Sequence, residues 1–399
     1  MLSFYSASTR MVNSERAIQE CIEAALGTDN VDCDLVVIHA SMGHDHKLLM
    51  ETAQSLCPSA KVVGSSCCGV IGSEGVSESM KDVAIMAVRG DVNEIAVAHV
   101  EEIYSANSFE KTADLAKQIK TQNPNVNMLH FLASGVDIDD QECIRGLESV
   151  LGSEVTIFGA TSADSMRGVV SYQMADGKCM EHGAWAVGYA DPTLAVETQA
   201  THGFMAAGEP MVVTKSEQNR IIELDGRPAW EVYTERLALS PDATCGETIP
   251  IGALAEVLPD DLAEEYGNKH ILRVVTKHKE QEMFYATTIA EGTKLWLTVR
   301  DEERIFNDLD RLVEQLKERI NGKEIVAVFH ADCLARGRFL FNRVMKEELV
   351  GKMQYPLVND KGVIPPWLGM YGFGEFARLG GENAYHNYST ALYAIYRND

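Results

Sequence analysis

One pattern occurs three times along the chain and limits its fold more than any other feature. A short apolar run leads to a small polar or thiol side chain, a helical stretch follows, and a second apolar run ends at a glycine. In the first copy the run at 35–40 leads to Ser41 and the second run ends at Gly64, and in the second copy Ser134 and Gly159 take these places. Short continuous apolar runs that alternate with helices are typical of sheets covered by helices. The sequence therefore predicts a mixed α/β fold.

A third copy of the pattern lies near the C-terminus and is less regular. Its first apolar run, at 325–329, leads to Asp332 and Cys333, and the expected helix covers about 336–349. After a longer connection, a glycine-rich run at 368–372 takes the place of the second apolar run. Open α/β sheets bind ligands beyond the carboxyl ends of their strands, so we expect the three units to direct residues at these ends toward a shared cleft.

The segment between the second and third copies has a different pattern. It contains several short strand-like runs, and an amphipathic helix at 305–320 precedes the third copy. At 399 residues the chain is long for one compact domain. We therefore predict two packed α/β domains, 1–222 and 223–399, built from related strand–helix–strand–turn–strand units with helices covering the sheets.

The composition excludes several classes of protein. With 35 basic and 59 acidic residues the net charge is −24, which disfavours binding to nucleic acids or anionic membranes. No run approaches about 18 apolar residues, and the first residues make a poor signal peptide, so a cytoplasmic protein without membrane insertion is expected. The nine cysteines are scattered, odd in number and without a C-x-x-C pair, which favours reduced thiols.

Two glycine-rich segments, 64–69 and 369–374, follow apolar runs, as phosphate-binding loops do. Neither contains the G-x-x-x-x-G-K-[ST] order of a P-loop, so a nucleotide site is not expected. Glycine permits a tight turn between strands, and it also lets a backbone approach a ligand closely. Both roles stay open for these segments.

Several histidines are candidate metal ligands. His44 and His46 stand at the start of a predicted helix, where solvated side chains are common, and His182 and His202 stand at strand edges. His386 comes directly before the closing strand and is the strongest candidate. A structural imidazole bonded to a backbone carbonyl is the alternative for His386.

Cys333 is the candidate nucleophile. It follows a predicted strand, precedes a helix, and has Arg336 three positions later. A thiol near a helix N-terminus and a guanidinium is expected to have a lowered pKa, which suits nucleophilic or redox chemistry. The chain contains neither a G-x-S-x-G elbow nor a cysteine-protease signature, so ligand binding or packing is the alternative use of this thiol.

Five short segments carry a family resemblance. They are residues 62–72 (VVGSSCCGVIG), 224–233 (LDGRPAWEVY), 328–337 (VFHADCLARG), 372–375 (GFGE) and 385–389 (YHNYS). In this order they resemble the FIST sensory proteins of bacteria, and the resemblance covers the chain from about residue 30 to its end. Cys68 and His330 depart from the pattern, because small or hydroxyl residues are expected there.

The resemblance implies a sensory module for a small ligand rather than an enzyme. Many members act beside histidine kinases or other signalling proteins, so a separate output partner is implied, and a homodimer is possible. Stand-alone members resemble nitric-oxide-sensing haemoproteins that bind haem b and control a histidine kinase. By this resemblance haem b is the implied cofactor, with His386 as the metal ligand that we predict. The absence of C-x-x-C-H argues against covalent haem attachment.

The predicted ligand site combines both halves of the chain. Arg336 is expected to pair with a carboxylate or propionate, and Glu375 to receive an amine. Three classes compete: a haem sensor, a metal-free sensor of amino acids or other small carboxylates, and an enzyme with Cys333 as nucleophile. The predicted site residues are Cys333, Arg336, Gly374, Glu375, His386 and Asn387, facing Gly64, Ser65 and Ser66.

Overall fold

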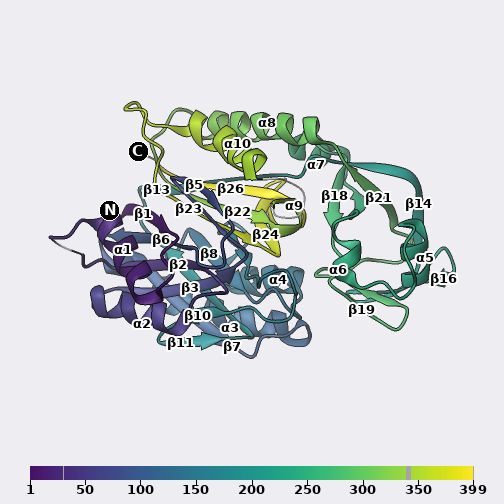
Figure 1. The fold of residues 1–399 in the computed structure, drawn as a ribbon, viewed down its shortest axis with the longest axis horizontal. Coiled ribbons are helices and arrows are strands. Elements are labelled where there is room, and N and C mark those ends of the chain that lie inside the picture. Colours follow the sequence, from purple (N-terminus) through teal and green to yellow (C-terminus); the bar gives the residue numbers. More distant parts are fainter. Residues whose placement is uncertain (30, 338–342, 399) are drawn as a thin grey trace.

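The computed structural model describes residues 1–29, 31–337 and 343–398, whose strands form four sheets (Figure 1). Each repeated unit of the sequence supplies the central strands of one six-stranded sheet, and the first apolar run is one of these strands. This strand pairs in parallel with the second run and antiparallel with the strand that closes the unit. The first sheet has the order β1 (Ser3–Thr9), β6 (Val83–Arg89), β2 (Leu35–Ser41), β3 (Lys61–Cys67), β10 (Gln173–Ala175) and β11 (Lys178–Met180).

The second and third sheets repeat this arrangement. The mixed α/β fold predicted from the apolar runs is thereby confirmed, and helices cover the sheets as expected. The second sheet has the order β7 (Ile95–Glu101), β12 (Gly183–Tyr189), β8 (Met128–Ala133), β9 (Thr156–Thr161), β24 (Gly374–Leu379) and β25 (Glu382–His386). The third has the order β13 (Leu194–Thr201), β26 (Thr390–Arg397), β22 (Ile325–Cys333), β23 (Trp367–Gly372), β4 (Val70–Gly72) and β5 (Gly75–Ser77).

The last two strands of each sheet are a hairpin from another unit. The hairpin β10–β11 of the second unit extends the first sheet, and β24–β25 of the third unit extends the second sheet. The hairpin β4–β5 of the first unit extends the third sheet, which closes the exchange. Every unit therefore donates one hairpin and receives one.

Glycines stand where each donated hairpin joins its new sheet. Gly64, Gly159 and Gly369 pair with the incoming strand and lie inside β3, β9 and β23, so Gly64 does not form the turn considered from the sequence. A Cβ at Gly64 would lie 2.7 Å from the carbonyl oxygen of Ile38 and 2.6 Å from the side chain of Met174. The absent side chain thus permits close approach of another strand.

A ring of backbone hydrogen bonds follows the same cyclic order. In each unit an amide that lies just beyond the second apolar run donates to a carbonyl in the corresponding run of another unit. The three equivalent bonds are Cys68 N to Tyr371 O (3.0 Å), Ala163 N to Ser66 O (3.1 Å) and Phe373 N to Thr161 O (3.2 Å). This repetition shows that the three units are arranged around a common centre.

The helices pack against the sheets through apolar faces, whose residues recur at helical spacing. Asp45, Asp139 and Asp301 each accept a backbone N–H as the N-cap of a helix. The amphipathic helix expected at 305–320 is confirmed. Of the helix expected at about 336–349, the structure describes helical residues on both sides of 338–342, which lie outside the described part. The helices are α1 (Ser14–Leu26), α2 (His46–Leu56), α3 (Ser108–Gln122), α4 (Asp140–Leu151), α8 (Glu302–Ile320), α9 (Leu334–Gly337) and α10 (Arg343–Gln354), with short turns η1 (Val92–Glu94), η2 (Ser105–Asn107) and η3 (Tyr355–Leu357).

The fourth sheet is built by the segment between the second and third units and stands to one side of the molecule (Figure 1). Residue 222, the predicted domain boundary, falls inside its strand β15 (Arg220–Leu224). In the described ranges no helix combines the length and apolarity needed to cross a bilayer. The sheet has the order β18 (His270–Arg273), β17 (Leu254–Val257), β21 (Lys294–Arg300), β14 (Phe204–Glu217), β15 (Arg220–Leu224), β20 (Glu282–Phe284) and β19 (Lys277–Lys279), with β16 (Arg227–Pro228) beside β15 and helices α5 (Ala229–Arg236), α6 (Cys245–Thr248) and α7 (Asp260–Tyr266).

Candidate functional site

The three units place related residues at the ends of their central strands. The backbone N–H of Ser41, Ser134 and Cys333 each donates a 2.9 Å hydrogen bond to a carbonyl at the start of the neighbouring antiparallel strand. The spacing seen in the sequence therefore corresponds to one structural position repeated three times. The side chains around this position differ between units, and the third unit carries a buried ion pair.

That ion pair joins Asp332, in β22, to Arg336, one turn later in α9. The Nη1 atom of Arg336 donates to Oδ2 of Asp332 at 2.8 Å, and the two residues are 0% and 3% exposed, respectively. Burial raises the pKa of Asp332 to about 6, although the guanidinium beside it acts in the opposite direction. The two charges thus lie in the interior, where an unpaired charge is costly.

One edge of the Arg336 guanidinium has no partner. Its Nε and Nη2 atoms make no hydrogen bond to the described residues, and Oδ1 of Asp332 is also unpartnered there. The Nε–H and Nη2–H groups form a planar pair of donors, which matches the two oxygens of a carboxylate. A buried, unsatisfied donor pair of this kind is unusual and marks a place where a ligand would restore hydrogen bonds.

Glu375 brings a second carboxyl group to this cluster. It lies in β24, the hairpin strand that the third unit donates to the second sheet, and it is fully buried. Its Oε2 atom accepts from the Ser389 hydroxyl at 2.5 Å, while Oε1 has no partner in the described structure. Burial raises the pKa of Glu375 well above its usual value, and Asp332 and Arg336 are close enough to influence it. The structure therefore places the Glu375 carboxyl group within electrostatic reach of Arg336, and ligand binding by these residues stays a prediction.

Cys333 lies in the same cluster, but its chemistry differs from the prediction. Its thiol donates to the carbonyl oxygen of Phe373 at 3.7 Å and is buried. Burial raises the pKa of Cys333 well above its ordinary value, and the nearby Glu375 acts in the same direction. The predicted lowering is therefore wrong, because desolvation of the thiolate has the largest effect and the charges of Glu375 and Asp332 add to it.

His386 and Asn387 lie next to the cluster. The His386 ring is fully buried, with Nδ1 at 3.2 Å from the Tyr266 hydroxyl and Nε2 at 3.2 Å from the Ala377 carbonyl. Burial lowers its pKa to about 4. Both ring nitrogens are thus used, so His386 does not fit an axial haem ligand in this structure. The Nδ2 atom of Asn387 has no partner among the described residues.

The glycine and serine residues expected on the other side of the site serve packing. The Nε1 atom of Trp185 donates to Gly64 O at 2.7 Å and to Ser65 Oγ at 3.1 Å. The Ser66 hydroxyl donates to the carbonyl oxygen of Ala163 at 2.8 Å. No hydrogen bond within the described ranges joins these three residues to Arg336. Gly374 pairs with Thr161 where its hairpin enters the second sheet.

Sequence reasoning missed a second, partly buried ion pair beside the site. Lys346 of α10 pairs with Glu78, which follows the hairpin β4–β5 of the first unit. The charge of Glu78 also acts to raise the pKa of Asp332, so the two ion pairs are neighbours. Glu78 and Lys346 lie far apart in the sequence, and neither belongs to a local motif that could have indicated the contact.

Three buried histidines line a small cavity where the three sheets meet. His39, His130 and His330 come from the central strands of the three units, and each has an Nδ1 atom without a partner in the described structure. Burial lowers the pKa of His39 and of His330 to about 3. The cavity has a volume of about 10 Å³, which is room for one water molecule. Within the described residues, no cluster of His, Cys, Asp and Glu could hold a metal ion.

From these buried neutral histidines we expect the free energy of unfolding to depend on pH. In the unfolded chain an imidazole takes up a proton below about pH 6.5, whereas His39 in the folded protein stays neutral to about pH 3. Protonation below pH 6.5 therefore stabilises the unfolded state only. The free energy of unfolding is highest above pH 6.5 and falls as the pH is lowered from there. Between pH 6.5 and 5 the free energy of unfolding should fall by about 2 kcal/mol more in wild type than in His39→Gln. The raised pKa values of Asp332 and Glu375 make the free energy of unfolding change with pH in the opposite direction, but both residues are present in wild type and in the variant. Denaturant titrations at the two pH values measure the difference, and equal losses would contradict it.

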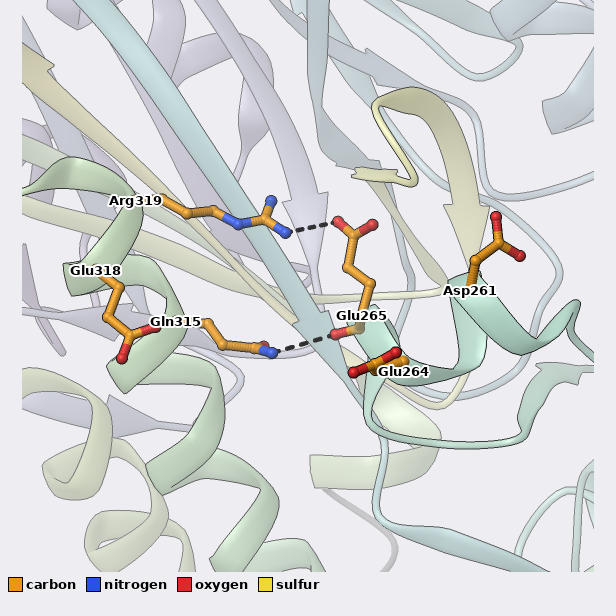
Figure 2. Close-up of a pocket in the computed structure, with 6 residues that line it drawn as sticks. All are labelled: Asp261, Glu264, Glu265, Gln315, Glu318 and Arg319. Atoms are coloured by element: carbon orange, nitrogen blue, oxygen red, sulfur yellow. Dashed lines mark hydrogen bonds and ion pairs between the residues drawn. The ribbon is translucent and has the colours of Figure 1, made fainter.

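A larger pocket of about 410 Å³ opens on the surface between α7 and α8 (Figure 2). Glu265 is held there by an ion pair with Arg319 at 2.8 Å and accepts at its backbone carbonyl from Gln315 at 3.4 Å. None of the predicted site residues lines it. The lining residues are Asp261, Glu264, Glu265, Gln315, Glu318 and Arg319.

Solved structures resemble the chain distantly. A crystal structure of cyanuric acid hydrolase from A. caulinodans covers 100% of both chains with 6% identity and a TM-score of 0.39. A second cyanuric acid hydrolase structure also covers 100% of both chains, with 9% identity and a TM-score of 0.34. PurL of T. maritima, complexed with AMPPCP, covers 99% of this chain and 72% of its own, with 10% identity and a TM-score of 0.22. Such low scores support no inference about activity.

Two family models match adjoining parts of the chain. The FIST N domain matches residues 34–227, and the FIST C domain matches residues 229–378. No curated protein matches the sequence. FIST domains are generally domains that sense small ligands in signal transduction. Because the two models together span most of the sequence in the order that its motifs indicated, the chain belongs to the FIST family.

Proposed function

We propose that this protein is a sensor that binds a small carboxylate ligand, such as an amino acid, at the buried cluster of Asp332, Arg336 and Glu375. The observation that carries the proposal is the unpartnered Nε–Nη2 edge of a fully buried guanidinium. A carboxylate bound there would receive two parallel hydrogen bonds. The unpartnered Oε1 of Glu375 is an acceptor for a donor group, such as an amine, on the same ligand.

The position of the cluster suggests how binding would be transmitted. Arg336 follows β22 of the third sheet, whereas Glu375 lies in a strand of the second sheet. Since Arg336 is fully buried, a ligand enters only when these elements separate locally. A ligand that binds one arrangement better than the other shifts the balance between the two. We propose that a separate signalling protein, such as a histidine kinase, responds to this change.

The substitution Arg336→Lys tests the ligand site. Lysine keeps a positive charge beside Asp332 but lacks the planar pair of donors. We expect affinity for the carboxylate ligand to fall about 10- to 100-fold, the effect of losing one hydrogen bond to a charged group. A screen of amino acids and other small carboxylates for thermal stabilisation identifies the ligand, and calorimetry on the variant measures the loss. The matched control Arg319→Lys, on the surface, should keep full affinity, and equal affinity in Arg336→Lys would contradict the site.

An enzyme that uses Cys333 as nucleophile is the competing function. Since burial raises the pKa of Cys333, we expect a thiol-reactive probe to label it slowly in the native protein. Cys179, an exposed thiol, should be labelled first. Peptide mapping after brief labelling compares the two, and preferential labelling of Cys333 would favour the enzyme.

Haem b binding and nitric oxide sensing stay predictions from the family resemblance. Because both ring nitrogens of His386 are engaged, no step is assigned to haem at this residue. An absorption spectrum of protein expressed with added haem tests the prediction. A Soret band that shifts with nitric oxide would support it, and a spectrum without haem absorption would contradict it.

A further inference from the structure

Two cysteines of the first unit lie side by side away from the proposed ligand site. Cys33 precedes β2 and Cys57 is the C-cap of α2. Their thiols are close enough for each to influence the pKa of the other. The Cys57 thiol also lies 3.0 Å from the carbonyl oxygen of Val31, and the Cys33 thiol 3.5 Å from that of Leu35. The two sulfur atoms therefore meet where two loops of the first unit come together.

Asp32 holds these two loops in place. Its carboxylate accepts from the backbone N–H of Cys33 at 3.1 Å, and from the backbone N–H and hydroxyl of Ser59 at 3.2 and 2.7 Å. The Nε atom of Arg89 donates to the carbonyl oxygen of Asp32 at 3.0 Å. One residue thus connects the segment that contains Cys33 to the segment that follows Cys57.

The environment distinguishes the two thiols. The interaction between the two thiols lowers the pKa of Cys57 and raises that of Cys33. At both thiols burial and the charge of Asp32 act to raise the pKa, and the charge of Arg89 acts to lower it. Cys57 is buried, but the next residues, Pro58 and Ser59, are exposed, so a single loop separates the thiols from solvent. Oxidation of the two thiols thus requires only a local opening of this loop.

We propose that Cys33 and Cys57 form a reversible disulfide in response to a hydroperoxide, which makes this pair of loops a redox modification site. The Cys57 thiolate attacks the peroxide oxygen, the O–O bond breaks, and a sulfenic acid and hydroxide form. The Cys33 thiol then attacks the Cys57 sulfur, the S–S bond forms, and water leaves. In sum, two thiols are oxidised, hydrogen peroxide is reduced, and two water molecules are released.

Treatment of the reduced native protein with hydrogen peroxide tests the proposal. Peptide mapping without reductant should show one cross-linked pair, Cys33 with Cys57, which disappears after dithiothreitol. Cys57→Ser should abolish this pair. The matched variant Cys21→Ser, which removes another buried thiol of the same unit, should retain it. Circular dichroism confirms that both variants are folded, and Cys33→Ala provides a second test that leaves Cys57 in place.

The exposed Cys179 reports whether the oxidant has acted. Formation of the Cys33–Cys57 pair at or below the peroxide dose that oxidises Cys179 supports the proposal. Oxidation of Cys179 while Cys33 and Cys57 remain reduced would overturn it. Cross-links that join other cysteines equally often would also overturn it, because they would indicate exchange in unfolded chains.

Discussion

Replacement of Arg336 by alanine is expected to lower the free energy of unfolding by about 3–5 kcal/mol, because it leaves the buried carboxylate of Asp332 without its partner. Denaturant titration measures the loss. The loss should shrink as the pH falls toward 5, since Asp332, whose pKa is already raised to about 6, then becomes neutral. Ligand binding should disappear with the guanidinium.

Two variants control for this expectation. The double variant Asp332→Asn with Arg336→Ala removes both charges and should recover part of the lost stability. Arg319→Ala removes a surface arginine that also makes ion pairs, and should cost no more than about 1 kcal/mol. A loss below about 1 kcal/mol for Arg336→Ala would show that the ion pair does not lie in a water-excluded interior.

Gly159→Ala is expected to destabilise the protein by about 2–6 kcal/mol, the sum of backbone strain and overpacking. Gly159 has a φ of +137°, and a Cβ added there would collide with the carbonyl oxygen of Phe131, its neighbour on the parallel strand. The residue sits where β24 joins β9, so relaxation would separate the donated hairpin from its sheet. Thermal and denaturant unfolding measure the effect.

Gly152 provides a matched control for this substitution. Its φ is +92°, but a Cβ there would have no atom within 4 Å. Gly152→Ala therefore introduces backbone strain without a collision, and should cost about 1–3 kcal/mol. Equal losses in the free energy of unfolding would show that the collision with Phe131 adds nothing to the cost of Gly159→Ala.

The sequence predicts those parts of the fold that depend on local pattern. The apolar run that leads to Ser41 is β2, and the helical spacing at 305–320 is α8. The exchange of hairpins could not be predicted, because strands such as β10 are three residues long and pair with residues far away in the chain. Such pairings depend on tertiary contacts that leave no periodic signal.

The site was predictable in part for a similar reason. Arg336 and Glu375 belong to short motifs that the sequence displays, and both are buried, close enough for the guanidinium to influence the pKa of the carboxyl group. The pKa of Cys333 was predicted in the wrong direction, since proximity along the chain indicates a neighbouring charge but not the extent of desolvation. The pair of Glu78 and Lys346 had no local signal at all.

The exchanged hairpins also determine when each sheet can be completed during translation. The strands β4 and β5 leave the ribosome early but must wait for β23, near the end of the chain, before they can pair. The second sheet likewise waits for β24 and β25, which follow β23. A fragment that stops between the FIST N and FIST C regions contains the first sheet complete, an orphaned hairpin, and a second sheet without its last strands. The first sheet can therefore form before the third unit is synthesised, whereas the second and third sheets are completed only when the strands of that unit become available.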